Sequence, residues 1–204
     1  KRIAFFVWLA GAAFVLYQFM IQSSMSVMIP ALESSLHTNT TQIGLLASSY
    51  YYTYILCQVP SGLALDRYGY RLILTISILC SALTALFFGL THTLWSANID
   101  RLLMGIVSAP AVAGALSIAS RWFHDKHFPL LVGMTEMIGM LGGMIGELTL
   151  GTTTEKWGYH VTMYILAGFG LLIGLWMLYL CRYKAPTPRT AVPQSPPFFT
   201  LLKS

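Results

Sequence analysis

Arg101, Glu136 and Glu147 are charged side chains inside long apolar stretches of the sequence. When such a stretch crosses a membrane, an ionisable residue in it is by default paired and functional. Arg101 and Glu147 lie at similar depths in their stretches, whereas Asp100 precedes Arg101 directly and points about 100° away from it on a helix. We therefore predict an ion pair between Arg101 and Glu147. The alternative is that Arg101 extends to the nearer membrane surface.

Glu136 has no basic residue one helical turn away, because Val132 and Met140 occupy those positions. A carboxyl group without a counter-ion in hydrocarbon suits a proton carrier or a polar contact to a substrate. A structural hydrogen bond is the third alternative, and the sequence leaves all three open.

Two runs carry uncharged polar residues at a spacing of four, which places them on one helix face. The predicted cavity residues are Gln18, Gln22 and Ser26 in the first run, and Tyr50, Tyr54 and Gln58 in the second. Such a face must contact protein or a water-filled cavity when it lies in a membrane. Amide and phenol groups suit a zwitterion, a nucleoside or a sugar better than a multiply charged anion. Hydrogen bonding between the two helices is the competing explanation.

A short segment between the second and third apolar runs holds an acid, two bases and two glycines. The residues are Gly62, Asp66, Arg67, Gly69 and Arg71. An acid beside bases at a helix end can form an ion-pair latch, and the glycines allow close approach and a sharp turn. The alternative is a solvated turn whose bases only set the membrane topology. The same order of residue types recurs in the segment Gly151–His160, which predicts an internal repeat.

The composition predicts an all-α polytopic membrane protein whose main partner is the lipid bilayer. The chain is 56% hydrophobic and 9% charged, whereas soluble domains have roughly 25% charged residues. Six continuous apolar runs approach or exceed the ~20 residues that a helix needs to cross a bilayer. They cover residues 4–30, 42–65, 71–91, 95–119, 128–151 and 159–181.

The distribution of basic residues predicts a cytoplasmic N-terminus, because Lys and Arg collect on the cytoplasmic side. With six crossings, that side holds Lys1, Arg2, Arg67, Arg71, Arg121, Lys126, Arg182, Lys184, Arg189 and Lys203, and the other side holds Lys156. Membrane topology thus explains the net charge of +5, and no nucleic-acid partner is predicted. The two copies of the repeated segment then lie on opposite faces, which predicts two inverted three-helix repeats. We assign residues 1–184 to this unit and the proline-rich residues 185–204 to the start of a cytoplasmic linker.

Enzymatic chemistry is not predicted. The sequence contains no nucleophile–base constellation, and no Gly-Lys-Ser/Thr follows the glycines of the loop segment to make a phosphate loop. The five histidines lack metal-ligand spacing, and the three cysteines lie in apolar runs. We therefore predict no cofactor and no metal.

The pattern Gly62-x3-Asp66-Arg67-x-Gly69-x-Arg71 resembles the loop signature of the major facilitator superfamily, with Tyr70 where the family usually has a second base. Asp100-Arg101-x3-Gly105 is similar to the family's fourth-span motif. The resemblance implies that this chain is the N-terminal six-helix half of a transporter that works by alternating access, with a C-terminal half absent from this chain. It also implies that Asp66 stabilises the outward-facing state with Arg71 as its partner. The segments at residues 17–30 and 135–140 look like the phagosomal nutrient transporters of bacteria, which take up amino acids or nucleosides.

We therefore predict proton-coupled uptake of a small polar nutrient, such as an amino acid, across a bacterial inner membrane. Residues 182–204 would be cytoplasmic, like the N-terminus. Efflux of a drug or siderophore-like metabolite is the first alternative, and a scaffold or homodimer without transport is the second.

The fifth run contains Gly139-x3-Gly143 and Gly142-x3-Gly146, a spacing that predicts close helix crossing. It matches the glycine motif of drug antiporters only partly, which favours uptake.

Overall fold

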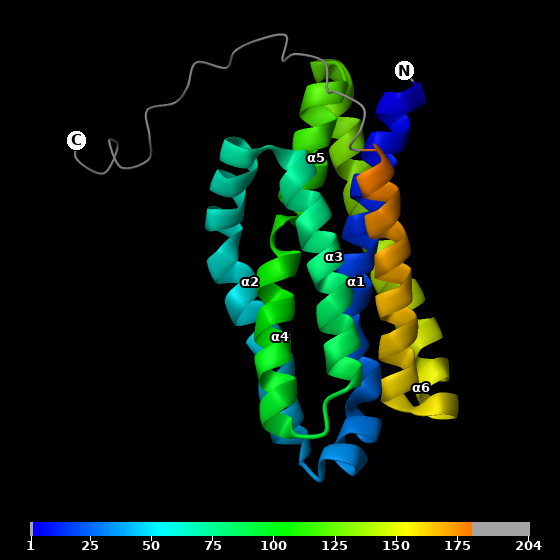
Figure 1. Cartoon of the computed structure of the whole chain (residues 1–204). Helices are drawn as coiled ribbons and strands as arrows, with labels where there is room; N and C mark the ends of the chain where they lie inside the picture. Colours follow the sequence, from blue (N-terminus) through cyan, green and yellow to red (C-terminus); the bar gives the residue numbers. More distant parts are fainter. Residues whose placement is uncertain (1, 181–204) are drawn as a thin grey trace, which may run out of the picture.

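The computed structural model describes residues 2–180, and these residues form helices joined by short connections (Figure 1). The elements are α1 (Arg2–Leu36), α2 (Thr40–Tyr68), α3 (Tyr70–Gly89), α4 (Leu94–Ser108), α5 (Pro110–Trp122), a 3-10 turn η1 (Asp125–His127) and α6 (Phe128–Leu180). No strand occurs among the described residues. The prediction for residues 185–204 lies outside them.

Helix α1 lies in the interior, where it packs along α6 and α5. Its buried side chains occur along its whole length, from Ala4 to Leu32. The outward faces of the other helices carry large apolar residues, such as Leu56 with 74% and Leu172 with 66% of the side chain exposed. A surface of this kind is suited to lipid or to a further protein unit.

Helices α4 and α5 are two parts of one rod. The backbone of Ala109 is still helical, with φ −55° and ψ −36°. Pro110 has no backbone N–H and cannot donate to the preceding turn, so the hydrogen-bond ladder is interrupted there. Taken together, the two parts form one apolar segment of 29 residues, Leu94–Trp122.

The long helix α6 reverses direction at Gly158, which has the non-helical backbone angles φ 80° and ψ 167°. The hydroxyls of Thr154 and Thr162 lie 3.1 Å apart, although eight residues of straight helix would separate them by about 12 Å. Figure 1 shows the resulting hairpin as a descending arm and an ascending arm that meet at the lower end of the bundle. The two arms correspond to the predicted runs 128–151 and 159–181.

The repeated segments of the sequence form two similar elbows. Gly69 joins α2 to α3 with φ 82° and ψ 147°, close to the angles of Gly158. Each glycine is followed by a buried tyrosine, Tyr70 or Tyr159, which hydrogen-bonds to another segment. Figure 1 places the α2–α3 junction and the turn of α6 at opposite ends of the bundle. These features support the predicted repeat, while its inverted symmetry remains a prediction.

By length and composition, four helical segments in the described part of the chain qualify as membrane spans: Arg2–Leu36, Tyr70–Gly89, Leu94–Trp122 and Asp125–Leu180. Helix α2 is not among them, because its middle is rich in Ser, Thr, Tyr and Gln, which lower its mean hydropathy. The hairpin shape of α6 favours two crossings within the last segment. The count of six crossings therefore remains a prediction.

Gly158→Ala is expected to destabilise the protein by about 1–3 kcal/mol, because almost only glycine adopts a positive φ together with an extended ψ. Thermal unfolding of the full-length protein in detergent measures the effect. Gly168→Ala is the matched control, since Gly168 lies in the regular part of the same helix with no atom within 4 Å of an added Cβ. Equal stability of the two variants would contradict a structural role for the elbow glycine.

Candidate functional site

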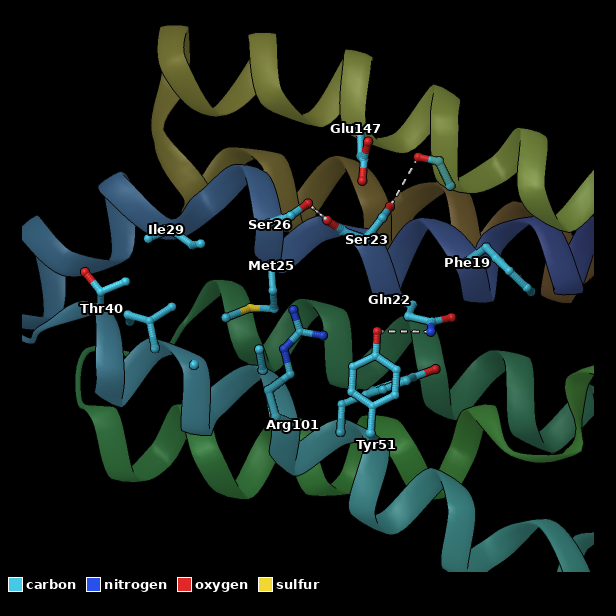
Figure 2. A pocket seen from close by; sticks show the side chains of 15 residues that line it. Phe19, Gln22, Ser23, Met25, Ser26, Ile29, Thr40, Tyr51, Arg101 and Glu147 are labelled. Carbon is cyan, nitrogen blue, oxygen red and sulfur yellow. Dashed lines mark hydrogen bonds between the residues drawn. The ribbon is translucent and has the colours of Figure 1, made fainter.

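A cavity of about 440 Å³ opens between α1, α2, α4 and α6 (Figure 2). Its size lies in the range of small-molecule sites. Most of its lining comes from α1 residues between Phe19 and Ile29 and from α2 residues between Thr40 and Tyr51. Arg101 and Glu147 are the charged residues that line it.

Arg101 is completely buried and is held by neutral groups. Its two terminal nitrogens donate to the carbonyl oxygen of Ile21 at 3.2 Å and to the hydroxyl of Ser24 at 3.1 Å. Its guanidinium carbon also lies 5.2 Å from the ring centroid of Phe88. The Nε atom has no hydrogen-bond partner. Arg101 is thus a fixed cation in the wall of the cavity.

The predicted ion pair between Arg101 and Glu147 is not formed. Figure 2 shows the two side chains approaching α1 from different helices, Arg101 from α4 and Glu147 from α6. Glu147 is exposed, and among residues 2–180 no carboxylate forms an ion pair with Arg101. The alternative, extension of Arg101 to the membrane surface, is also wrong, because its side chain is 0% exposed and bonded to α1.

The neighbouring Asp100 is a charged residue that the sequence analysis did not assign to the site. It is 5% exposed, and its Oδ2 atom has no hydrogen-bond partner. Arg101 in the cavity wall and Asp100 behind it are thus adjacent buried groups of opposite charge, and each has an atom without a hydrogen-bond partner. The sequence places Asp100 inside an apolar run, but its position directly before Arg101 argued against a pair on one helix face.

The polar faces of α1 and α2 meet as their spacing predicts. Gln18 donates to the hydroxyl of Tyr50 at 3.3 Å, and Gln22 donates to the hydroxyl of Tyr51 at 3.1 Å. Tyr50 also stacks on Tyr54, with ring centroids 5.7 Å apart. Tyr51 lines the cavity, and the rule of four-residue spacing missed it because it follows Tyr50 directly.

Of the remaining predicted site residues, one lines the cavity and the others do not. Ser26 lines the cavity and donates to the carbonyl oxygen of Ser23. Tyr54, Gln58 and Glu136 are not among its lining residues. Glu136 is half-buried on α6, next to Thr135, whose hydroxyl accepts from the indole nitrogen of Trp8 at 3.1 Å.

The loop segment at the α2–α3 elbow is organised around Tyr70. Its hydroxyl accepts hydrogen bonds from Trp122 at 2.7 Å and from Nε of Arg71 at 3.3 Å. The guanidinium groups of Arg71 and Arg121 both lie 5.8 Å from its ring centroid. Asp66 is exposed, and its pairing with Arg71 remains a prediction. Arg67 is exposed, and Gly62 lies in the last part of α2.

These features describe a polytopic α-helical membrane protein with a mainly apolar cavity between its helices, into which a few polar and charged groups project. The model of the Major Facilitator Superfamily matches residues 8–204, and the chain belongs to this family. The resemblance inferred from the loop and fourth-span motifs is therefore confirmed. The family and the relatives described below are transporters.

Two curated relatives have names that concern sugar acids. The chain is 26% identical over 195 residues to the hexuronate transporter of Bacillus subtilis (strain 168), covering 94% of this chain and 44% of that protein. It is 29% identical over 177 residues to the probable L-galactonate transporter of Escherichia coli (strain K12), covering 85% and 38%. The chain thus spans less than half the length of either relative. Neither name supports the predicted amino-acid substrate.

A solved structure confirms the fold. It is that of a bacterial homologue of the human lysosomal transporter Spinster, in an inward-facing and unoccupied conformation. It matches with a TM-score of 0.82 at 17% identity, over 98% of this chain and 47% of that chain.

Proposed function

We propose that this chain is the N-terminal half of a secondary transporter that takes up a small sugar acid by alternating access across a bacterial inner membrane. The family, the names of the relatives and a chain length below half of theirs support this proposal. The single observation that carries it is the buried Arg101 in the cavity wall, which has no carboxylate partner among the described residues.

A sugar acid carries a carboxylate and hydroxyls, which match two kinds of group in the cavity wall: the cation of Arg101 and uncharged hydrogen-bonding side chains. Its carboxylate would give Arg101 a hydrogen-bonded anionic partner, which the neighbouring Asp100 does not supply, and a charge-assisted hydrogen bond of this kind is stronger than a neutral one. Its hydroxyls suit the amide of Gln22 and the phenol of Tyr51, which lie in the same cavity. This substrate replaces the amino acid that we first predicted, because the names of the relatives concern sugar acids.

Coupling to protons is assigned to Glu136, whose half-buried carboxyl has no hydrogen-bond partner among those described. Proteoliposomes that contain the full-length protein should accumulate labelled galactonate or a hexuronate when a proton gradient is imposed. Glu136→Gln should abolish this accumulation while leaving exchange of labelled for unlabelled substrate nearly intact. If Glu136→Gln accumulates substrate normally, Glu136 is not the coupling site.

Competition experiments decide the substrate class. Unlabelled galactonate should inhibit uptake, whereas galactose, which lacks the carboxylate, should not. Inhibition by amino acids but not by sugar acids would overturn the proposed substrate. Outward transport of apolar compounds by the same vesicles would instead favour efflux.

A further inference from the structure

Two histidine rings meet where the connection between α3 and α4 lies against the elbow of α6. His92 belongs to this connection, and His160 follows the elbow glycine. Their ring centroids lie 5.4 Å apart, with an angle of 44° between the ring planes. Two imidazoles that bind one tetrahedral zinc ion through Zn–N bonds of about 2 Å have centroids about 5 Å apart. The distance between the two rings is therefore close to that in a shared metal site.

The hydrogen bond of His160 determines which of its ring nitrogens is available. Its Nδ1 lies 2.6 Å from the carbonyl oxygen of Gly89, the last residue of α3. Because a carbonyl oxygen only accepts, Nδ1 carries the proton and Nε2 keeps its lone pair. Metal-binding histidines commonly have this arrangement, in which the second ring nitrogen donates to a backbone carbonyl and holds the ring in place. The ring also packs on Tyr159, with centroids 3.9 Å apart.

Unlike the ring of His160, the ring of His92 can change its orientation. It is exposed and lies outside the helices, so its ring can rotate to direct a nitrogen at a shared ion. No group of three or more His, Cys, Asp or Glu residues suited to a metal occurs within residues 2–180. Water molecules, which have access through the exposed side of His92, would therefore complete the coordination shell.

We propose that His92 and His160 form a two-histidine site for a divalent transition-metal ion such as Zn²⁺. The ion would connect the end of α3 to the second arm of α6, and it would stabilise the folded protein because it binds the folded state preferentially. The site lies outside the cavity, so the proposal does not depend on the substrate.

The test is a titration of the full-length protein in detergent with Zn²⁺, after removal of any affinity tag, by isothermal titration calorimetry and thermal unfolding. We expect saturable binding of one ion and a rise in the unfolding temperature. His92→Asn and His160→Gln should each weaken Zn²⁺ binding at least tenfold and remove the thermal shift. His92→Asn is the decisive variant, because an exposed loop residue is replaced and the fold should be retained.

The matched control is His37→Asn. His37 is exposed and has a positive φ of 48°, which Asn tolerates better than most residues. This variant should bind Zn²⁺ like the wild type. Unchanged Zn²⁺ affinity in His92→Asn, or the absence of saturable binding in the wild type, would overturn the proposal.

Discussion

Arg101→Met is expected to abolish uptake of a sugar acid while leaving the protein as stable as the wild type or more stable. The buried cation is costly in an apolar environment, and Met fills a similar space without that cost. The two groups that accept hydrogen bonds from Arg101 keep a partner after the change, because the hydroxyl of Ser24 donates to the carbonyl oxygen of Ile21 at 2.7 Å. We expect uptake to fall at least 100-fold, since the charge-assisted contact to the carboxylate is lost. Transport in proteoliposomes and thermal unfolding measure the two effects.

A loss of uptake without a loss of stability would distinguish a role of Arg101 in binding from a role in holding the fold together. If Arg101 only holds α4 against α1, Arg101→Met should lower the unfolding temperature, and uptake should fall only as far as the folded fraction does. Arg101→Lys is the control, because Lys keeps the charge but loses the planar fork of donors. It should retain part of the uptake. Full uptake of a sugar acid by Arg101→Met would exclude the proposed role in binding.

Gly142→Ala is expected to destabilise the protein by at least about 2 kcal/mol, because added volume at a close helix crossing forces the backbones apart. A Cβ on Gly142 would collide with the carbonyl oxygen of Leu16 and lie 2.8 Å from its Cα. These are backbone atoms of α1, the interior helix, and they cannot rotate away as a side chain can. Thermal unfolding in detergent is the measurement.

Gly143→Ala is the matched control, because it makes the same substitution at the next position of the same helix. The nearest atom to its added Cβ is a ring carbon of Phe19 at 4.0 Å. We therefore expect a change below about 0.5 kcal/mol, as at sites without tight packing. A similar loss of stability in both variants would show that the crossing of α1 and α6 does not depend on Gly142.

Much of the fold follows from the sequence because apolar length and glycine placement are local signals. The runs 42–65, 71–91 and 95–119 fall within a few residues of α2, of α3 and of the α4–α5 rod. The first run was predicted to end at residue 30, but α1 continues through Pro30 to Leu36. Hydropathy marks only the apolar part of a helix, whereas the end of α1 depends on polar residues close to the capping box of α2 at Asn39.

The candidate site was only partly predictable, because sequence gives the depth of a residue in a span but not the rotation of its helix. Arg101 and Glu147 were placed at similar depths, yet Arg101 faces Ser24 on α1. The spacing of the glycines in the fifth run likewise did not show which of them face α1. Gly139, Gly142 and Gly146 are buried against α1, while Gly143 lies at the edge of the contact.

The interruption at Pro110 has a mechanical consequence for the span that carries Arg101. Ala109 donates to the carbonyl oxygen of Ile106 at 3.4 Å, a three-residue contact in place of the usual four-residue one. Because Pro110 cannot donate a backbone hydrogen bond, bending should cost less at this point than elsewhere in the rod. We expect the outer and inner halves of this span to tilt as separate stiff segments, with the cation of the cavity on one of them.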